Sequence, residues 1–185
     1  AGLIPMVYPD YQSVSDPKIR ANFAKAWNMS EDLLDPEPGL TVVEIMHAIT
    51  DGKIRGLYVQ GENPAMSDPD ANHAREALAA LDHLVVQDIF LTETAYLADV
   101  ILPASAFPEK TGTFTNTDRT VQMGRQALNP PGEAKQDLWI IQQMANRLGL
   151  DWQYKHVSEV FDEMRHTMPS ICLLYTSDAA DDTPC

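Results

Sequence analysis

The chain has 185 residues, of which 44% are hydrophobic and 22% charged, and this composition is typical of a soluble globular protein. Its formal net charge of −14 repels the phosphates of nucleic acids and anionic lipid surfaces, so both are poor partners. No apolar run approaches the roughly 20 residues that cross a bilayer. The first residues also lack a signal-peptide pattern, so we expect a cytoplasmic location without membrane insertion.

Cysteine is confined to the end of the chain. Cys172 and Cys185 are the two cysteines, so residues 1–171 contain no thiol. This excludes a disulfide, a cysteine-held iron–sulfur cluster and a cysteine nucleophile from that part of the chain. The five histidines are scattered without the spacing of a metal site, and surface or packing roles explain them more simply. We therefore expect no metal ligand in this part of the chain.

The first predicted elements are an arm and a helix. Residues 1–39 are rich in proline and aspartate and predict an irregular arm with one short helix over 19–27. Thr41 and Glu44 then form a capping box that starts a helix ending at residues 51–52. Its apolar stripe at helical spacing consists of Val42, Ile45, Met46 and Ile49.

Three strands follow, alternating with helices. The strands are predicted at residues 54–60, 83–87 and 99–103, and the helices at 70–81 and 92–98. Apolar residues share one face of the first of these helices, namely Ala74, Ala77, Leu78 and Leu81. The alternation predicts an α/β fold, with a parallel Rossmann-like sheet and flanking helices covering both of its faces. Ligands bind at the carboxyl ends of strands in such sheets.

The remainder of the chain is looser. Residues 109–119 are polar and turn-rich and indicate a long functional loop, and a short strand is predicted at 121–125. Two helices follow at residues 133–148 and 158–168. The residues expected on their buried faces are Leu138, Ile141, Ala145 and Leu148 in the first, and Val160, Phe161, Met164 and Met168 in the second.

Three charged residues have both a ligand-binding and an ordinary interpretation. Asp88, beyond a buried strand, suits ribose hydroxyls, or it caps the following turn. Lys110 offers a charge to a pyrophosphate, although a solvated loop lysine is commoner. Asp137 suits the helix dipole at the start of its helix, and its carboxylate is also complementary to the paired N–H donors of guanine. The glycine fingerprint G-x-G-x-x-G is absent, which argues against a standard nicotinamide site.

Four stretches, taken together, resemble the molybdopterin oxidoreductases, with the closest likeness to the alpha subunit of formate dehydrogenase. They are residues 59–64 (VQGENP), 85–103 (VVQDIFLTETAYLADVILP), 109–119 (EKTGTFTNTDR) and 131–139 (PGEAKQDLW). The resemblance implies bis-molybdopterin guanine dinucleotide carrying molybdenum or tungsten, with this segment holding one of the two dinucleotides. The positions that match nucleotide contacts of the family are Glu62, Asn63, Ser67, Gln87, Asp88, Lys110 and Asp137.

The resemblance also implies parts that this sequence does not contain. The family's cysteine or selenocysteine metal ligand, the histidine beside it, its catalytic arginine and its iron–sulfur cysteines belong to other segments. The chain therefore resembles an internal fragment of a subunit that oxidises formate to carbon dioxide. Its implied partners are formate, the remaining domains of the same subunit and electron-transfer subunits. Periplasmic nitrate reductase, the large subunit of NADH-quinone oxidoreductase and a non-catalytic nucleotide-binding module remain as alternatives.

We expect four parts along the chain. They are an irregular arm at 1–39, an α/β dinucleotide-binding core at 40–104, a loop and helical extension at 105–171 that completes the cofactor site, and a non-native tail at 172–185. The tail resembles translated sequencing-adaptor sequence at the end of a metagenomic read. It has no amphipathic period, so we expect that it does not pack on the core.

Overall fold

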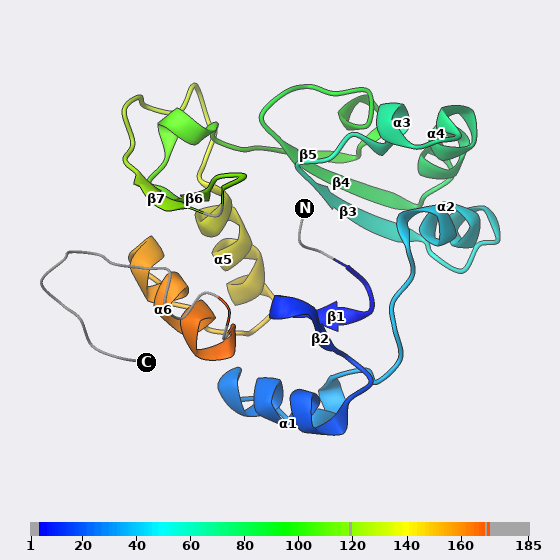
Figure 1. The fold of residues 1–185 in the computed structure, drawn as a ribbon. Helices are drawn as coiled ribbons and strands as arrows, with labels where there is room; N and C mark the ends of the chain where they lie inside the picture. Colours follow the sequence, from blue (N-terminus) through cyan, green and yellow to red (C-terminus); the bar gives the residue numbers. More distant parts are fainter. Residues whose placement is uncertain (1–3, 119, 169, 171–185) are drawn as a thin grey trace, which may run out of the picture. The chain divides into compact units, whose positions relative to one another are not determined.

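The computed structural model describes residues 4–118, 120–168 and 170 and divides the chain into two compact units (Figure 1). The sheet unit comprises residues 42–111 and 124–153. The helical unit comprises residues 112–123 and the described residues before 42 and from 154 onward. Each unit is described by itself. The predicted tail at 172–185 lies outside the described residues.

A three-stranded parallel sheet forms the centre of the sheet unit. Its strands are β3 (Gly56–Gln60), β4 (His83–Asp88) and β5 (Val100–Pro103), in the order β3-β4-β5. The predicted strands and their parallel pairing are thus confirmed. In a parallel sheet the three carboxyl ends meet at one edge, and the loops that follow the strands begin there.

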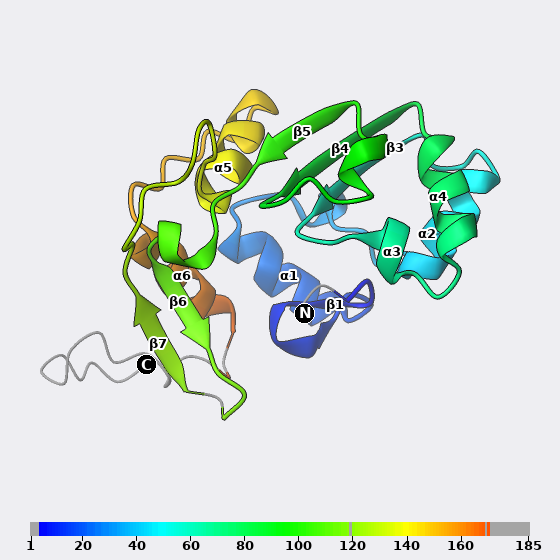
Figure 2. The ribbon, with the colours of Figure 1, turned by 90° about the horizontal axis from the view of Figure 1, so that it is seen from above.

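Helices α2 (Val42–Thr50), α3 (Pro64–Ser67) and α4 (Ala71–Ala79) lie on one side of this sheet (Figure 2). Between β4 and β5 the chain forms only a 3₁₀ turn, η3 (Ala95–Leu97), where a short helix was predicted. The apolar residues of these helices meet the strands in one cluster of Met46, Ile49, Val59, Ala65, Ala74, Ala77, Leu78, Leu84, Val86 and Ala95. The predicted face of α4 is therefore buried as expected.

The other face of the sheet carries polar side chains beside apolar ones. Val59 and Val86 face the helices, so their neighbours along the strands, Tyr58 and Gln87, point to the opposite side. Helix α5 (Asp137–Arg147) begins against this side, since Asp137 is hydrogen-bonded to Gln87. Before it, the 3₁₀ turn η4 (Phe107–Glu109) follows β5.

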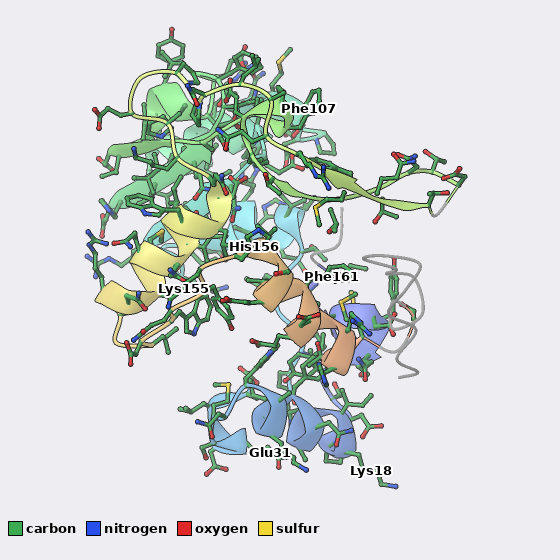
Figure 3. All side chains as sticks on the ribbon, turned by 90° about the vertical axis from the view of Figure 1, so that its left-hand side faces the viewer. Lys18, Glu31, Phe107, Lys155, His156 and Phe161 are labelled. Carbon is green, nitrogen blue, oxygen red and sulfur yellow. The ribbon has the colours of Figure 1, made fainter. Side chains whose placement is uncertain are left out.

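The helical unit contains short elements and two helices. Its elements are β1 (Val7–Tyr8), η1 (Pro9–Tyr11), β2 (Gln12–Ser13), α1 (Pro17–Ala26), η2 (Glu31–Leu33), β6 (Gly112–Thr115), most of β7 (Val121–Gly124) and α6 (Val157–Thr167). The rings of Tyr8 from β1, Phe23 from α1 and Trp27 at the end of α1 pack together, with centroids 4.7 Å apart for the first two and 4.9 Å for the last two. Helix α6 is capped by His156, whose ring accepts from the Ser158 amide, and it buries Phe161 (Figure 3).

Several side chains expected to be buried are exposed. Val42 is 53% exposed, Leu148 79% and Met164 40%. The first two lie at the ends of their helices, where the stripe runs past the packed turns. Helix α5 also begins four residues later than predicted, because Lys135 is extended and forms a parallel bridge with Ala104. Ile140 is buried in place of the predicted Ile141.

None of the helices in the described part of the chain combines the length and the apolar character that crossing a bilayer requires.

Candidate functional site

Two polar networks lie at the carboxyl edge of the sheet. The first surrounds the loop after β3, which begins at Gly61 with a φ of +61°, a conformation that glycine adopts without strain. The Gly61 amide donates to the Gln87 carbonyl at 2.8 Å and so extends the strand pairing by one bond. The next loop residues are therefore held beside the end of β4.

Asn63 connects this loop to the segment after β4. Its Oδ1 accepts from the Thr94 hydroxyl at 2.8 Å and from the Thr94 amide at 3.1 Å, while its Nδ2 donates to Glu93 at 2.7 Å. The Thr94 hydroxyl in turn accepts from the Ala65 amide at 3.1 Å, and the Thr94 side chain is fully buried. Hydrogen bonding to Asn63 lowers the pKa of Glu93. We name Asn63, Ala65, Glu93 and Thr94 the loop clamp.

Asp88 is the last residue of β4, one position further into the strand than predicted. Its Oδ1 accepts from the amides of Ile89 and Phe90, at 2.6 and 3.2 Å. These are the contacts of an aspartate that caps a turn, which was the ordinary interpretation of this residue.

The second network runs across the other face of the sheet. The Tyr58 hydroxyl donates to Gln87 Oε1, Gln87 Nε2 donates to Asp137 Oδ1 at 2.7 Å, and Lys110 donates to Asp137 Oδ2. Three predicted residues, Gln87, Lys110 and Asp137, are thus brought together. We name these three residues and Tyr58 the relay.

Burial changes along the relay. Gln87 is completely inaccessible, whereas the side chains of Lys110 and Asp137 are 27% and 30% exposed. Burial, followed by the negative charge of Asp137, raises the pKa of Tyr58, so its hydroxyl remains a donor at neutral pH. The relay therefore starts at an uncharged tyrosine and ends at a partly exposed pair of opposite charges.

Three side chains of the two networks were missed by sequence reasoning, namely those of Tyr58, Glu93 and Thr94. Tyr58 stands in the middle of a strand and shows no sign of polar contact in the sequence. The signal lies in the register: Gln60 pairs with Gln87, so Tyr58, two residues earlier on the same face, lies diagonally within reach. Of the other predicted residues, Glu62 and Ser67 are exposed, and Ser67 is the last residue of α3.

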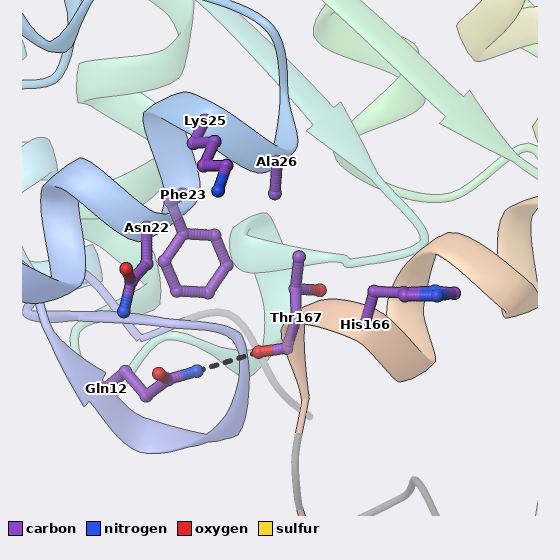
Figure 4. Close-up of a pocket in the computed structure, with 7 residues that line it drawn as sticks. All are labelled: Gln12, Asn22, Phe23, Lys25, Ala26, His166 and Thr167. Carbon is purple, nitrogen blue, oxygen red and sulfur yellow. Dashed lines mark hydrogen bonds between the residues drawn. The ribbon is translucent and has the colours of Figure 1, made fainter. Parts of the chain in front are cut away.

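The helical unit contains a separate hollow of about 500 Å³ between α1 and α6 (Figure 4). It is lined by Gln12, Asn22, Phe23, Lys25, Ala26, His166 and Thr167, none of which was a predicted site residue. Gln12 closes one side by donating to the Thr167 carbonyl at 2.9 Å. The predicted site is therefore not at this hollow.

The chemistry of the relay suits a nucleotide better than a metal ion. A carboxylate accepts from neighbouring N–H donors and an ammonium group donates to phosphate oxygens, and both groups are partly open to solvent. Within the described ranges, no group of three or more histidine, cysteine, aspartate or glutamate side chains is arranged to hold a metal ion. These residues therefore fit the nucleotide part of a molybdopterin cofactor, and the described chain offers no ligand set for its metal.

Comparison with known proteins agrees with the resemblance. Putative formate dehydrogenase YrhE of Bacillus subtilis is 48% identical over 168 residues, which are 91% of this chain and 17% of that protein. The F420-dependent formate dehydrogenase subunit alpha of Methanocaldococcus jannaschii is 49% identical over 172 residues, 91% of this chain and 24% of that protein. The chain thus spans about a fifth of the length of these relatives.

A solved structure shares the fold. Acetylene hydratase from Pelobacter acetylenicus superposes with a TM-score of 0.60 over 78% of this chain and 21% of that chain, at 22% sequence identity. A family model described as molybdopterin oxidoreductase matches residues 15–147, which is most of the chain. The chain therefore belongs to the molybdopterin oxidoreductase family, and this membership implies a molybdopterin cofactor.

Proposed function

We propose that this chain is the part of a formate dehydrogenase subunit that holds one guanine dinucleotide of a bis-molybdopterin guanine dinucleotide cofactor. The reaction of the whole subunit is the oxidation of formate to carbon dioxide, a proton and two electrons. The names of the two relatives support formate over nitrate or NADH as the substrate. The observation that carries the proposal is the Lys110–Asp137 pair at the carboxyl edge of the parallel sheet.

The two charged residues take complementary parts of the dinucleotide. Asp137 accepts the two adjacent N–H donors of guanine, while Lys110 leaves Asp137 and offsets the charge of the pyrophosphate. Each hydrogen bond of this charged kind contributes about 1.5–3 kcal/mol. The bound cofactor supplies molybdenum or tungsten as the two-electron acceptor, and the residues of this segment contribute only binding.

The remaining predicted residues lie at or beyond the ends of β3 and β4. Gln87 and Asp88 end β4, Glu62 and Asn63 lie on the loop after β3, and Ser67 is the last residue of α3. The division into a core at 40–104 and an extension at 105–171 places Lys110 and Asp137 in the extension. Electron-transfer subunits and iron–sulfur clusters belong to the proposed whole enzyme and lie outside this segment.

The test is Asp137→Asn in the intact subunit. The asparagine keeps one oxygen for Gln87, so the buried amide stays paired, but it lacks the second acceptor that guanine needs. Alanine is a poorer choice, because it would leave the amide of the buried Gln87 unpaired at a cost of about 1–3 kcal/mol. The measurement is the GMP released by acid from each purified polypeptide, with formate-dependent dye reduction beside it.

The matched control is Glu159→Gln, which removes an acidic charge from the first turn of another helix, α6. We expect Asp137→Asn to lower the GMP content more than tenfold, in line with the loss of one charged hydrogen bond. The control should retain its GMP. Equal GMP content in both variants would contradict the proposal.

A further inference from the structure

A fully buried glutamine in a sheet of apolar residues requires an explanation. Gln87 lies on β4 between Gln60 of β3 and Leu102 of β5, and no part of it is exposed. Leucine or valine would fill this position without the cost of removing an amide from water. Gln87 instead makes one hydrogen bond with each end of its side chain, to Tyr58 and to Asp137.

The direction of these two bonds follows from the chemistry of the groups. An ionised carboxylate only accepts, so the amide nitrogen of Gln87 must face Asp137. The amide oxygen of Gln87 then faces Tyr58, whose hydroxyl must donate. The opposite orientation of the amide would place its oxygen against the carboxylate oxygen. The carboxylate therefore determines which way the glutamine amide points, and the tyrosine hydroxyl holds the amide in that orientation by donating to its oxygen.

The glutamine amide in turn holds the carboxylate. Asp137 Oδ1 accepts from the buried amide at 2.7 Å, and Oδ2 accepts from Lys110, whose side chain is 27% exposed. One oxygen thus has a buried neutral donor, while the other has a partly exposed charged one. The buried donor orients the carboxylate and stays in place when Lys110 moves away.

We propose that Tyr58 is a positioning residue for guanine recognition, acting through Gln87 to orient the Asp137 carboxylate. This inference rests on the proposed function, since it concerns how Asp137 meets guanine. The Tyr58 hydroxyl acts through the amide of Gln87 and not directly on the nucleotide. Without that hydroxyl the Gln87 amide oxygen loses its partner and the amide is held from one end only, by Asp137, so the carboxylate is less firmly held in the orientation that two parallel N–H···O bonds require.

The experiment compares two nucleotides on the intact subunit freed of its cofactor. GDP offers the carboxylate two adjacent N–H groups, whereas IDP lacks the exocyclic amine and offers one. The ratio of their dissociation constants therefore reports carboxylate orientation, and a variant that is merely less stable leaves this ratio unchanged. Tyr58→Phe keeps the ring and removes only the hydroxyl. Gln87→Leu is the second variant, and Tyr96→Phe, at a tyrosine that is 74% exposed, is the matched control.

We expect Tyr58→Phe and Gln87→Leu each to lower the preference for GDP over IDP about three- to tenfold, the effect of one net hydrogen bond. Tyr96→Phe should leave the preference unchanged. An unchanged preference in Tyr58→Phe, while Asp137→Asn loses it, would overturn the role of Tyr58 and leave the proposed function intact. If Asp137→Asn itself keeps the preference, the guanine assignment fails and the inference fails with it.

Discussion

The loop clamp and the relay lie at the same edge of the sheet but differ in where their hydrogen bonds end. In the loop clamp, Asn63 and Thr94 use their polar atoms on each other, on Glu93 and on the Ala65 amide. In the relay, the bonds run from a buried amide to a pair of charged groups that are about 30% exposed. The loop clamp thus closes on the protein around the fully buried Thr94, with only Glu93 exposed, while the relay runs from the buried Gln87 to a partly exposed ion pair.

This difference separates structural from ligand-facing polar residues. Breaking a closed network leaves buried groups unpaired, so the cost appears in stability. Removing one member of the Lys110–Asp137 pair leaves the other where water can hydrogen-bond to it, so the cost appears in ligand binding. Residues of both networks were predicted from the sequence to bind the nucleotide. Their contacts now predict different effects of substitution, on stability in the loop clamp and on ligand binding in the relay.

The largest effect on stability is expected for Thr94→Val. Valine keeps the shape but leaves the Ala65 amide and Asn63 Oδ1 without their hydroxyl partner in a buried position. The free energy of unfolding should fall by about 1–3 kcal/mol, measured by denaturant titration. Thr117→Val, at an exposed position, should change it by less than about 0.5 kcal/mol. Equal effects would show that the loop clamp contributes nothing to stability.

A second effect, on binding, is expected for Lys110→Met. The ion pair with Asp137 is partly exposed, so its loss should change the unfolding free energy by less than about 1 kcal/mol. GDP should nevertheless bind about tenfold more weakly, because the pyrophosphate loses a charged donor. Guanosine, which has no phosphate, is the matched probe.

The affinity for guanosine should stay the same or rise in Lys110→Met, since Lys110 no longer competes for Asp137. Titration calorimetry of both ligands on the intact subunit, freed of its cofactor, measures the two affinities. A parallel loss for guanosine and GDP would mean that Lys110 supports the fold of the site and does not contact phosphate.

The sheet and its covering helices were predictable because their signals are local. The strands are short apolar runs that end at residues such as Gly61 and Pro103, and α4 shows its buried face at helical spacing. These features depend on neighbouring residues alone. The start of α5 did not follow from such a pattern, because the bridge between Ala104 and Lys135 keeps the chain extended up to Gln136.

The candidate site was predictable in part. Gln87, Lys110 and Asp137 came from the family resemblance, and the structure joins them through hydrogen bonds. Tyr58 could not be found in this way, because its contact with Gln87 depends on the register between two strands whose paired residues are 27 positions apart in the sequence. Strand β6 was likewise missed, because its residues are turn-like by themselves and become a strand only beside β7.

The smallest effect concerns a tyrosine in the helical unit that meets a carboxylate directly, without an intervening amide. The Tyr154 hydroxyl lies 2.5 Å from Glu163, and this hydrogen bond, with burial, raises the pKa of Tyr154 to about 12. A raised pKa in the folded state means that the stabilisation is complete below about pH 10, the ordinary tyrosine value, and is lost as the pH rises through about 12. The difference in stability between the parent protein and Tyr154→Phe should therefore be constant at neutral pH and shrink between these two values. Alkaline absorbance titration provides the direct measurement: Glu163→Gln, which keeps an acceptor but removes the charge, should lower the pKa of Tyr154, whereas Glu159→Gln should leave it at about 12. If Glu163→Gln left the pKa of Tyr154 unchanged, the Glu163 carboxylate would not be the cause of the raised pKa. The contrast with Tyr58, which meets a carboxylate only through the amide of Gln87, would then have no basis.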